Sequence, residues 1–337
     1  MSLTLVGIGL DLRISPAAYR VITLVTLASL VFIIVTGAAV RLTDSGLGCS
    51  TWPNCESDSF FPRPESGANG WIEQGNRLVT GAVGLFTLAA VLGARRRSPR
   101  RDDLFRWSLG LPAWVMGNAL VGAMVVWLHL APVSVIGHFL LSLGAVWNAL
   151  VLHHKAGEDP APDGQRRDLA VPAVRRACDL LLVAAGTALV TGTVVTGSGP
   201  HAGDERADRL PFAVGDVARI HGAVVVVFLV LTLAVWWKVR SGDATPSVEG
   251  RVRTLFLVLA AQAGVGYMQY FNDVPAWLVA IHVFGAATVW MAVVSLRLGL
   301  AEPLVAGSAP ALRSGTTTDG VTSQPAVPPT RGVVIGG

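Results

Sequence analysis

The sequence predicts an all-α polytopic membrane protein with about eight transmembrane helices, and three observations support this prediction. Hydrophobic residues make up 52% of the 337 residues and charged residues only 14%, and the mean hydropathy is +0.56. The apolar residues are gathered into runs about as long as a bilayer requires. Basic residues are concentrated between alternate pairs of these runs. Together these features exclude an ordinary soluble enzyme.

Each apolar run is close to the roughly 20 residues that a helix needs to cross the hydrocarbon core. The second run is short, and the third and fourth are separated only by the turn around Pro132. No cleavable signal peptide is expected, because the first run leads into a chain that keeps crossing. The expected helices are 21–40, 78–94, 107–128, 131–152, 178–197, 217–237, 254–271 and 276–298.

Arginine and lysine clusters follow the second, fourth and sixth runs, whereas the loops 41–77 and 197–219 carry no basic block. The positive-inside rule therefore predicts a multi-pass protein of the cell (plasma) membrane with both termini in the cytoplasm and these two loops outside. The clusters also account for the net charge of +4. We thus expect membrane lipid, and no nucleic acid, as a partner.

Segments of the first half resemble segments of the second, which predicts an internal duplication. IVTGAAVRLTDSG (34–46) resembles VVTGSGPHAGD (194–204), NRLVTGAVGLFTL (76–88) resembles HGAVVVVFLVLTL (221–233), and APVSVIGHFLLSLGAVW (131–147) resembles VPAWLVAIHVFGAATVW (274–290). The helices are therefore expected to form two tandem four-helix bundles with equivalent pockets. The expected parts are a cytoplasmic N-terminus (1–20), an N-terminal half (21–155), a cytoplasmic linker (156–177), a C-terminal half (178–298) and a disordered cytoplasmic tail (299–337).

Three of the seven histidines, His138, His221 and His282, fall inside or at the outer ends of expected helices. Ionisable side chains in a membrane are costly, so a functional role is the first hypothesis for them. His221 and His282 are expected at the same depth, and two imidazoles from facing helices suit the iron of a b-type haem. Neutral imidazoles bonded to neighbouring helices are the alternative. Zinc or copper is disfavoured because no carboxylate or thiolate accompanies the pair.

The first half has Asn76 where the repeat places a histidine, and it adds Glu73 and Arg77 on the same helical face. These three residues are expected to converge on the first pocket, opposite His138. A pocket with one axial ligand and a carboxylate suits a reacting molecule, whereas one with two histidines suits a fixed electron carrier. The alternative is an ion pair between Glu73 and Arg77 at the start of the helix.

Cys49 and Cys55 enclose five residues of the first outer loop, on the oxidising side of the membrane. Two interpretations remain open for this pair. One is a static disulfide that orders the loop, and the other is a redox-active pair that exchanges electrons or thiols.

These residues resemble the haem A synthase family, the membrane enzymes that convert haem O to haem A for cytochrome oxidase assembly. The resemblance spans about residues 20–298 and rests on three segments and on His138, His221 and His282. The segments are TGAAVRLTDSGLGCSTWPNC, IEQGNRLVTG and VVTGSGPHAGD.

The resemblance implies an oxidoreductase that acts on a porphyrin methyl group, with haem O as substrate. It implies a haem b cofactor on His221 and His282, a substrate haem in the N-terminal half, and catalysis by Glu73. It also implies that Cys49 and Cys55 match the outer-loop cysteine pair of bacterial members. A haem O synthase or oxidase assembly factors are the expected protein partners. The chain departs from the family motif in having Asn76 in place of histidine, which leaves His138 as the N-terminal iron ligand.

Three other classes fit part of the same pattern. One is a thiol oxidoreductase based on Cys49 and Cys55, which would leave the histidines unexplained. A non-enzymatic haem carrier or oxidase assembly factor would need the pockets but no chemistry by Glu73. A b-type cytochrome electron-transfer subunit would usually hold two haems with four histidines, and only three are suitably placed here.

Overall fold

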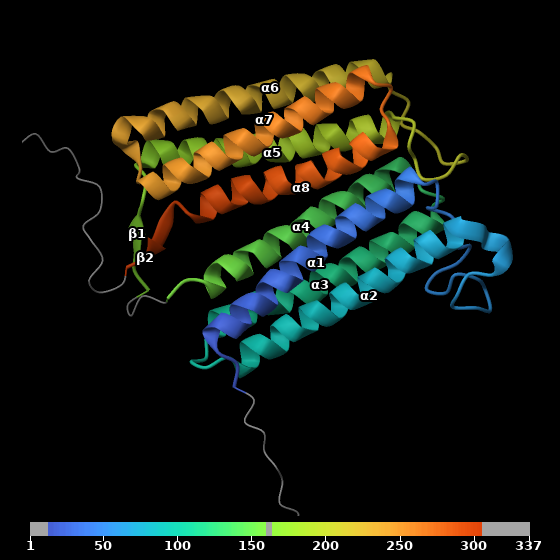
Figure 1. Cartoon of the computed structure of the whole chain (residues 1–337), viewed down its shortest axis with the longest axis horizontal. Helices are drawn as coiled ribbons and strands as arrows, with labels where there is room; N and C mark the ends of the chain where they lie inside the picture. Colours follow the sequence, from blue (N-terminus) through green and yellow to red (C-terminus); the bar gives the residue numbers. More distant parts are fainter. Residues whose placement is uncertain (1–12, 160–163, 305–337) are drawn as a thin grey trace, which may run out of the picture.

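The computed structural model describes residues 13–159 and 164–304 of the chain. These residues contain eight helices that are long and apolar enough to span a membrane. They form two adjacent four-helix bundles, the lower one blue to green and the upper one green to red in Figure 1. The prediction of an all-α polytopic protein is confirmed. The helices are α1 (Pro16–Leu42), α2 (Gly67–Arg96), α3 (Asp102–Trp127), α4 (Pro132–Ala156), α5 (Pro172–Ser198), α6 (Val214–Lys238), α7 (Pro246–Phe271) and α8 (Ala276–Leu298).

The ends of the helices coincide with local sequence signals more closely than with the ends of the apolar runs. Four of the eight helices, α1, α4, α5 and α7, begin with proline at the first or second position, where its missing N–H costs nothing. The largest difference from the sequence prediction is in α2, which begins at Gly67 and not near residue 78. Its first turns are polar and lie against the preceding loop, so the hydropathy of the sequence does not reveal them.

Short elements connect the helices. A 3-10 turn, η1 (Pro64–Ser66), precedes α2, and a π-helical turn, η2 (Val239–Asp243), follows α6. Strand β1 (Arg166–Asp168) pairs antiparallel with β2 (Ala301–Pro303), and Arg167 stands opposite Glu302. The region predicted as a disordered tail from residue 299 therefore starts with an ordered strand. The rest of that tail, 305–337, and residues 1–12 of the predicted cytoplasmic N-terminus lie outside the described residues.

The two bundles meet along α8, which packs against α1 and α4, while α4 also contacts α5 (Figure 1). The indole Nε1 of Trp290 on α8 donates a hydrogen bond of 3.1 Å to the carbonyl oxygen of Leu143 on α4. We call the end of the molecule that holds the loops 43–63 and 199–213 the cysteine-loop end. The opposite end, where Arg95 and Arg96 end α2 and Arg97 follows it, is the arginine-rich end.

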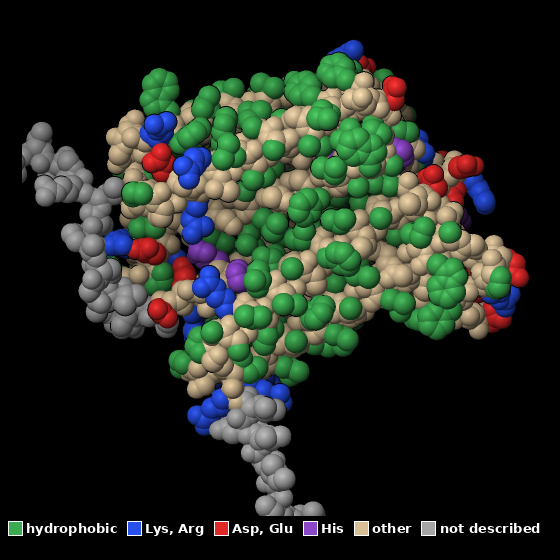
Figure 2. Space-filling model, in the orientation of Figure 1, with side chains coloured by type: hydrophobic (Ala, Val, Ile, Leu, Met, Phe, Trp, Pro, Cys, Tyr) green, Lys and Arg blue, Asp and Glu red, His purple; other side chains and the backbone are tan. Residues whose placement is uncertain are grey.

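Large apolar side chains cover the outside of the bundles, as a lipid-facing surface requires. Trp237, Phe271 and Val133 are each more than 70% exposed, whereas Tyr19 and Phe228 are fully buried between helices. In Figure 2 the hydrophobic side chains spread along the helices, and most charged side chains gather toward the two ends. This distribution is the one expected of a multi-pass membrane protein.

Candidate functional site

His221 and His282 lie together in the C-terminal bundle, as the sequence predicts. Their ring centres are 6.5 Å apart, and the ring planes are inclined by 79°. Metal–imidazole bonds are about 2 Å long and the ring centre lies about 1 Å further, so a metal held between two imidazoles needs ring centres about 6 Å apart. The pair from α6 and α8 therefore has the spacing required for two axial ligands of one iron.

The Nδ1 atoms of this histidine pair have different surroundings. Thr191 Oγ1 on α5 lies 3.1 Å from His221 Nδ1, which orients that ring. The buried Nδ1 of His282 has no hydrogen-bond partner among the described residues. A buried polar nitrogen without a partner is costly unless a ligand, an ion or water binds that nitrogen. Two imidazoles are the donor set of a low-spin haem, so the pair fits this group.

Each of these rings lies against a glycine of a neighbouring helix. A Cβ atom at Gly192 on α5 would be 3.1 Å from His221 Cε1, and one at Gly266 on α7 would be 3.2 Å from His282 Cε1. The absence of a side chain at these two positions lets the imidazoles lie between the helices. The glycines thus set the positions of the rings.

Replacing Gly266 with leucine is expected to push the His282 ring out of line with His221. If the pair holds a haem between its two rings, the low-spin haem per protein should fall about tenfold or more, because a misplaced supporting residue weakens a metal site by that order. The visible spectrum of the reduced protein measures this low-spin content. Gly264→Leu is the matched control, because a Cβ at Gly264 meets nothing within 4 Å. Equal haem content in the two variants would show that Gly266 does not seat the ring.

His138 occupies the corresponding place in the N-terminal bundle. A Cβ atom at Gly122 on α3 would be 3.3 Å from His138 Cε1. Gly122 precedes His138 by the same number of residues as Gly266 precedes His282, so the two bundles use one packing arrangement. An amide side chain also braces each helix, because Ser142 donates to Asn118 Oδ1 at 2.8 Å and Gln262 donates to the His282 carbonyl at 2.8 Å.

Asn76 takes the place of His221 in the N-terminal bundle. The hydroxyl of Thr36 on α1 lies 2.8 Å from Asn76 Oδ1 and 3.2 Å from the carbonyl oxygen of Ile33. A hydroxyl has one proton, and the shorter contact assigns it to Asn76. The side chain of Asn76 is therefore fixed against α1.

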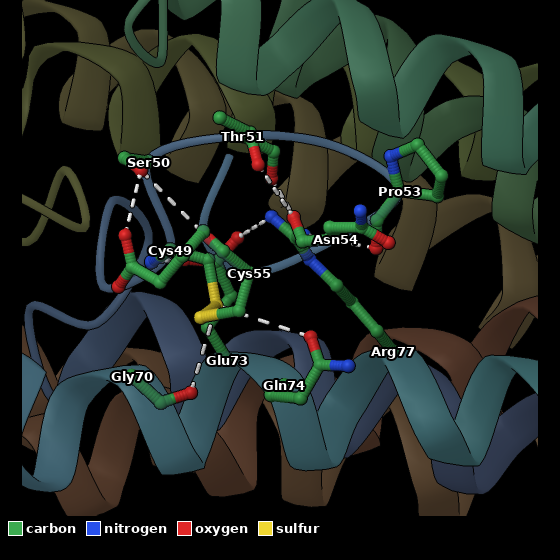
Figure 3. Close-up of polar contacts among 11 residues, drawn as sticks. Cys49, Ser50, Thr51, Pro53, Asn54, Cys55, Gly70, Glu73, Gln74 and Arg77 are labelled. Carbon is green, nitrogen blue, oxygen red and sulfur yellow. Dashed lines mark hydrogen bonds and ion pairs between the residues drawn. A yellow bond between two sulfur atoms is a disulfide. The ribbon is translucent and has the colours of Figure 1, made fainter. Parts of the chain in front are cut away.

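Glu73 and Arg77 bind the cysteine loop, whereas Asn76 binds a different element, helix α1. Figure 3 shows both side chains from α2 directed at the loop backbone. The Cys49 amide donates to Glu73 Oε2 at 2.7 Å, and Arg77 donates to Glu73 Oε1 at 2.5 Å. Successive residues are turned by about 100° around a helix, so Asn76 faces α1 while Arg77, one position later, faces the loop. The expected convergence of all three on one pocket is thus not seen in their contacts.

Arg77 also connects two turns of the loop. Its Nη1 group donates to the carbonyl oxygens of Thr51 at 2.7 Å and Asn54 at 3.0 Å. The side chains of Glu73 and Arg77 are only 7% and 14% exposed, so water screens their ion pair poorly. The ion pair considered as the alternative from the sequence is therefore present, but it is a buried clamp on the cysteine loop and not an exposed pair.

Cys49 and Cys55 are fully buried, and their sulfur atoms are 2.07 Å apart, bonded as a disulfide (Figure 3). The Cys49 sulfur lies 3.7 Å from the carbonyl oxygen of Gly70 and 3.9 Å from Gln74 Oε1. A bonded sulfur has no proton to donate, so these two are packing contacts. The pair thus sits directly on the first turns of α2, next to Glu73.

Glu56 follows the cysteine pair and closes the loop from the other side. Its carboxylate accepts hydrogen bonds from Ser66 Oγ at 2.6 Å and Ser50 Oγ at 3.0 Å. The hydrogen bond from Ser66, and then that from Ser50, lower the pKa of Glu56 below its ordinary value of 4.5. The ionised carboxylate therefore joins the cysteine loop to η1.

The loop is expected to open as the pH falls below about 4.5, the ordinary pKa of glutamate. A carboxyl whose pKa is lowered by folding stabilises the folded form above that value, and this contribution is lost as protons bind at lower pH. A water-soluble phosphine reduces the cysteine pair at a rate that is divided by its rate on a small exposed disulfide at the same pH, because the phosphine itself binds protons. This relative rate, measured between about pH 6 and about pH 3, should rise at the acidic end. In Glu56→Gln the rate should be higher throughout and should vary less with pH. Parallel profiles for the two proteins would contradict the role of Glu56.

Arg41, near the end of α1, joins the two bundles at the cysteine-loop end. Its guanidinium donates to the carbonyl oxygen of Thr196 at 2.7 Å and to that of His201. A backbone hydrogen bond of 2.8 Å from Gly46 to Gly203 runs beside it. The loop that carries the cysteines is therefore attached to the C-terminal half as well as to α2.

Sequence reasoning found the histidines, Glu73, Arg77 and the cysteines, but it missed the residues that position them. These are Thr36, Thr191 and the glycines Gly122, Gly192 and Gly266. The equal spacing from Gly122 to His138 and from Gly266 to His282 was a readable signal once the repeat was aligned. The threonines gave no signal, because a threonine in an apolar helix commonly bonds to its own backbone.

The described part of the chain has eight helices able to span a membrane, arranged in two bundles, and this defines a polytopic all-α membrane protein. Residues 20–203 match the model of a family described as cytochrome oxidase assembly protein. The chain belongs to this family, the haem A synthase family.

Individual relatives agree with this assignment. The chain is 27% identical over 263 residues to the protein named heme A synthase of Symbiobacterium thermophilum, and the match covers 74% of this chain and 84% of that protein. Proteins with the same name match shorter parts. That of Exiguobacterium sibiricum is 31% identical over 126 residues, covering 37% of this chain and 41% of that protein. That of Bacillus pumilus is 31% identical over 138 residues, covering 40% and 44%.

Proposed function

We propose that this protein oxidises a methyl group of haem O to a formyl group and so produces haem A for cytochrome oxidase. In this proposal the N-terminal bundle binds haem O through His138, and the C-terminal bundle holds haem b between His221 and His282. The observation that carries the proposal is the 6.5 Å spacing of the two imidazole rings in a chain of this family.

The residues of the chain have separate tasks in this reaction. Converting a methyl to a formyl group removes electrons and protons from the carbon and adds an oxygen atom, so positive charge develops at the reacting carbon. A carboxylate in a dry site stabilises such charge, and Glu73 is an acidic side chain buried in the N-terminal half. Haem b, when bound, supplies a one-electron carrier. His221 and His282 would hold it at a fixed place, apart from the substrate.

The proposal extends to the orientation in the membrane. The arginine-rich end is proposed to face the cytoplasm of the cell and the cysteine-loop end the outside, by the positive-inside rule. The cysteine pair would then lie where disulfides persist. A haem O synthase or an oxidase assembly factor is the proposed protein partner, because haem O must be delivered to the protein and haem A passed on.

Expression in a host that makes haem O but lacks its own haem A synthase tests the proposal. Membranes are extracted, and the haems are separated and identified by mass spectrometry, with the empty vector as control. Haem A should appear only with this protein. Recovery of unmodified haem O bound to the protein would identify a carrier, and recovery of haem b alone would identify an electron-transfer cytochrome.

A further inference from the structure

The two bundles share one arrangement for the histidine on the fourth helix and differ at the second helix. His138 and His282 each lie against a glycine of the preceding helix. A Cβ atom on that glycine would be 3.3 Å from His138 Cε1 in the first bundle and 3.2 Å from His282 Cε1 in the second. On the second helix the C-terminal bundle offers the imidazole of His221, whereas the N-terminal bundle offers the amide of Asn76. A carboxamide is not an axial ligand of haem iron in the way that histidine, methionine, cysteine or tyrosine is.

The other described histidines and methionines of the N-terminal half do not replace the missing imidazole. His154 lies 3.2 Å from Glu158, and the buried Tyr19 lies against Gly93 near the arginine-rich end of α2. His129 is exposed beyond the end of α3, and His153 lies 3.0 Å from Thr23 at the arginine-rich end. Met116 and Met124 on α3 are 63% and 48% exposed on the outside of the bundle. The carboxylate of Glu73 is already bound by the Cys49 amide and by Arg77.

The amide of Asn76 is held in one orientation. Its Oδ1 accepts the hydroxyl proton of Thr36 at 2.8 Å, and its backbone carbonyl accepts a hydrogen bond from Thr80 at 3.1 Å. No partner for the Nδ2 group is found within residues 13–159 and 164–304. In haem proteins with one axial histidine, small ligands bind to the iron on the opposite face. A fixed N–H donor on that face favours their binding.

We infer that the N-terminal bundle binds the iron of its haem through His138 alone and leaves the other axial position open beside Asn76. That position would take a small neutral or anionic ligand of the class of carbon monoxide and cyanide, with the Asn76 amide as hydrogen-bond donor. The C-terminal bundle, with two imidazoles, would be closed to such ligands. This inference rests on the proposed function, because it assumes that the N-terminal bundle binds haem.

Carbon monoxide binding to the full-length protein tests the open position. The purified protein is saturated with protohaem, reduced with dithionite and titrated with carbon monoxide, while the Soret band is recorded. About half of the bound haem should react, because only one of the two sites has a single imidazole. Asn76→His should reduce the reactive fraction to near zero and give a second six-coordinate, low-spin haem. His138→Ala should remove the reactive haem from the protein.

Cyanide binding to the ferric protein tests the amide. Asn76→Leu should keep the carbon monoxide stoichiometry of the wild type and weaken cyanide binding by about tenfold, the effect of losing a hydrogen bond to a charged ligand. Thr36→Val removes the hydrogen bond that holds the Asn76 amide, and it should weaken cyanide binding less than Asn76→Leu does.

Three results would overturn the inference. If wild type and His138→Ala bind the same amount of haem, the N-terminal pocket itself is wrong, and the proposed function fails with it. If the haem is lost in His138→Ala but does not react with carbon monoxide in the wild type, the pocket stands and the open position is wrong. If Asn76→Leu binds cyanide as the wild type does, the amide does not face the iron.

Discussion

Replacing His282 with alanine is expected to remove the haem b that we propose for the C-terminal bundle. The ring lies 6.5 Å from that of His221, between α7 and α8, and its loss takes away one of the two iron–nitrogen bonds. Loss of a residue that merely supports a metal ligand weakens binding by about 10–100-fold, so loss of the ligand itself should cost more. The reduced spectrum should lose its low-spin component while the protein still assembles in the membrane.

His201→Ala is the matched control for this experiment. His201 belongs to the same half, but its Nε2 lies 2.9 Å from the carbonyl oxygen of Val274 in a loop, away from the ring pair. That variant should keep the low-spin haem. Imidazole added to His282→Ala should restore the low-spin spectrum by filling the space of the deleted ring. A low-spin spectrum in His282→Ala without added imidazole would show that His282 is not a ligand.

The sequence predicted the fold well because membrane helices are specified by composition over long windows. The apolar runs located all eight helices, since every backbone polar group in lipid must be satisfied within a helix. The start of α2 was not predicted. The segment from Gly67 to Arg77 is polar, and it is helical where it packs under the cysteine loop, with Gly48 and Gly70 in close approach. That is a tertiary contact, which a window of sequence does not contain.

For the candidate site, the sequence predicted the pairing of the two histidines but not the contacts of Glu73, Asn76 and Arg77. Pairing His221 with His282 required only the repeat and a common depth, and the structure brings the two rings together. The same repeat did not show that Asn76 and Arg77, although adjacent, serve different neighbours. The direction of a side chain around a helix axis depends on which element lies beside it. For Glu73 that element is the cysteine loop, and the periodicity of the sequence does not predict the path of a loop.

Replacing Glu73 is expected to stop haem A formation while haem b is retained. If the carboxylate stabilises charge at the reacting carbon, Glu73→Ala and Glu73→Gln should both lower haem A output by about 100-fold or more, the usual effect of removing one electrostatic group from an active site. Haem extraction and mass spectrometry give the ratio of haem A to haem b. Glu65→Gln, which neutralises an exposed carboxylate in η1 just before α2, should leave the ratio unchanged.

The two variants also separate chemistry from the clamp that Glu73 forms. Alanine removes the acceptor of the Cys49 amide and leaves Arg77 without its carboxylate, so the cysteine loop should loosen. The glutamine carbonyl oxygen still accepts the Cys49 amide, and Arg77 keeps the carbonyl oxygens of Thr51 and Asn54. If Glu73 acts only by holding the loop, Glu73→Gln should therefore retain most of the haem A output that Glu73→Ala loses. Equal loss in both variants would assign the effect to the charge of the carboxylate and its pairing with Arg77, because glutamine keeps the shape of the side chain and its contact with the Cys49 amide.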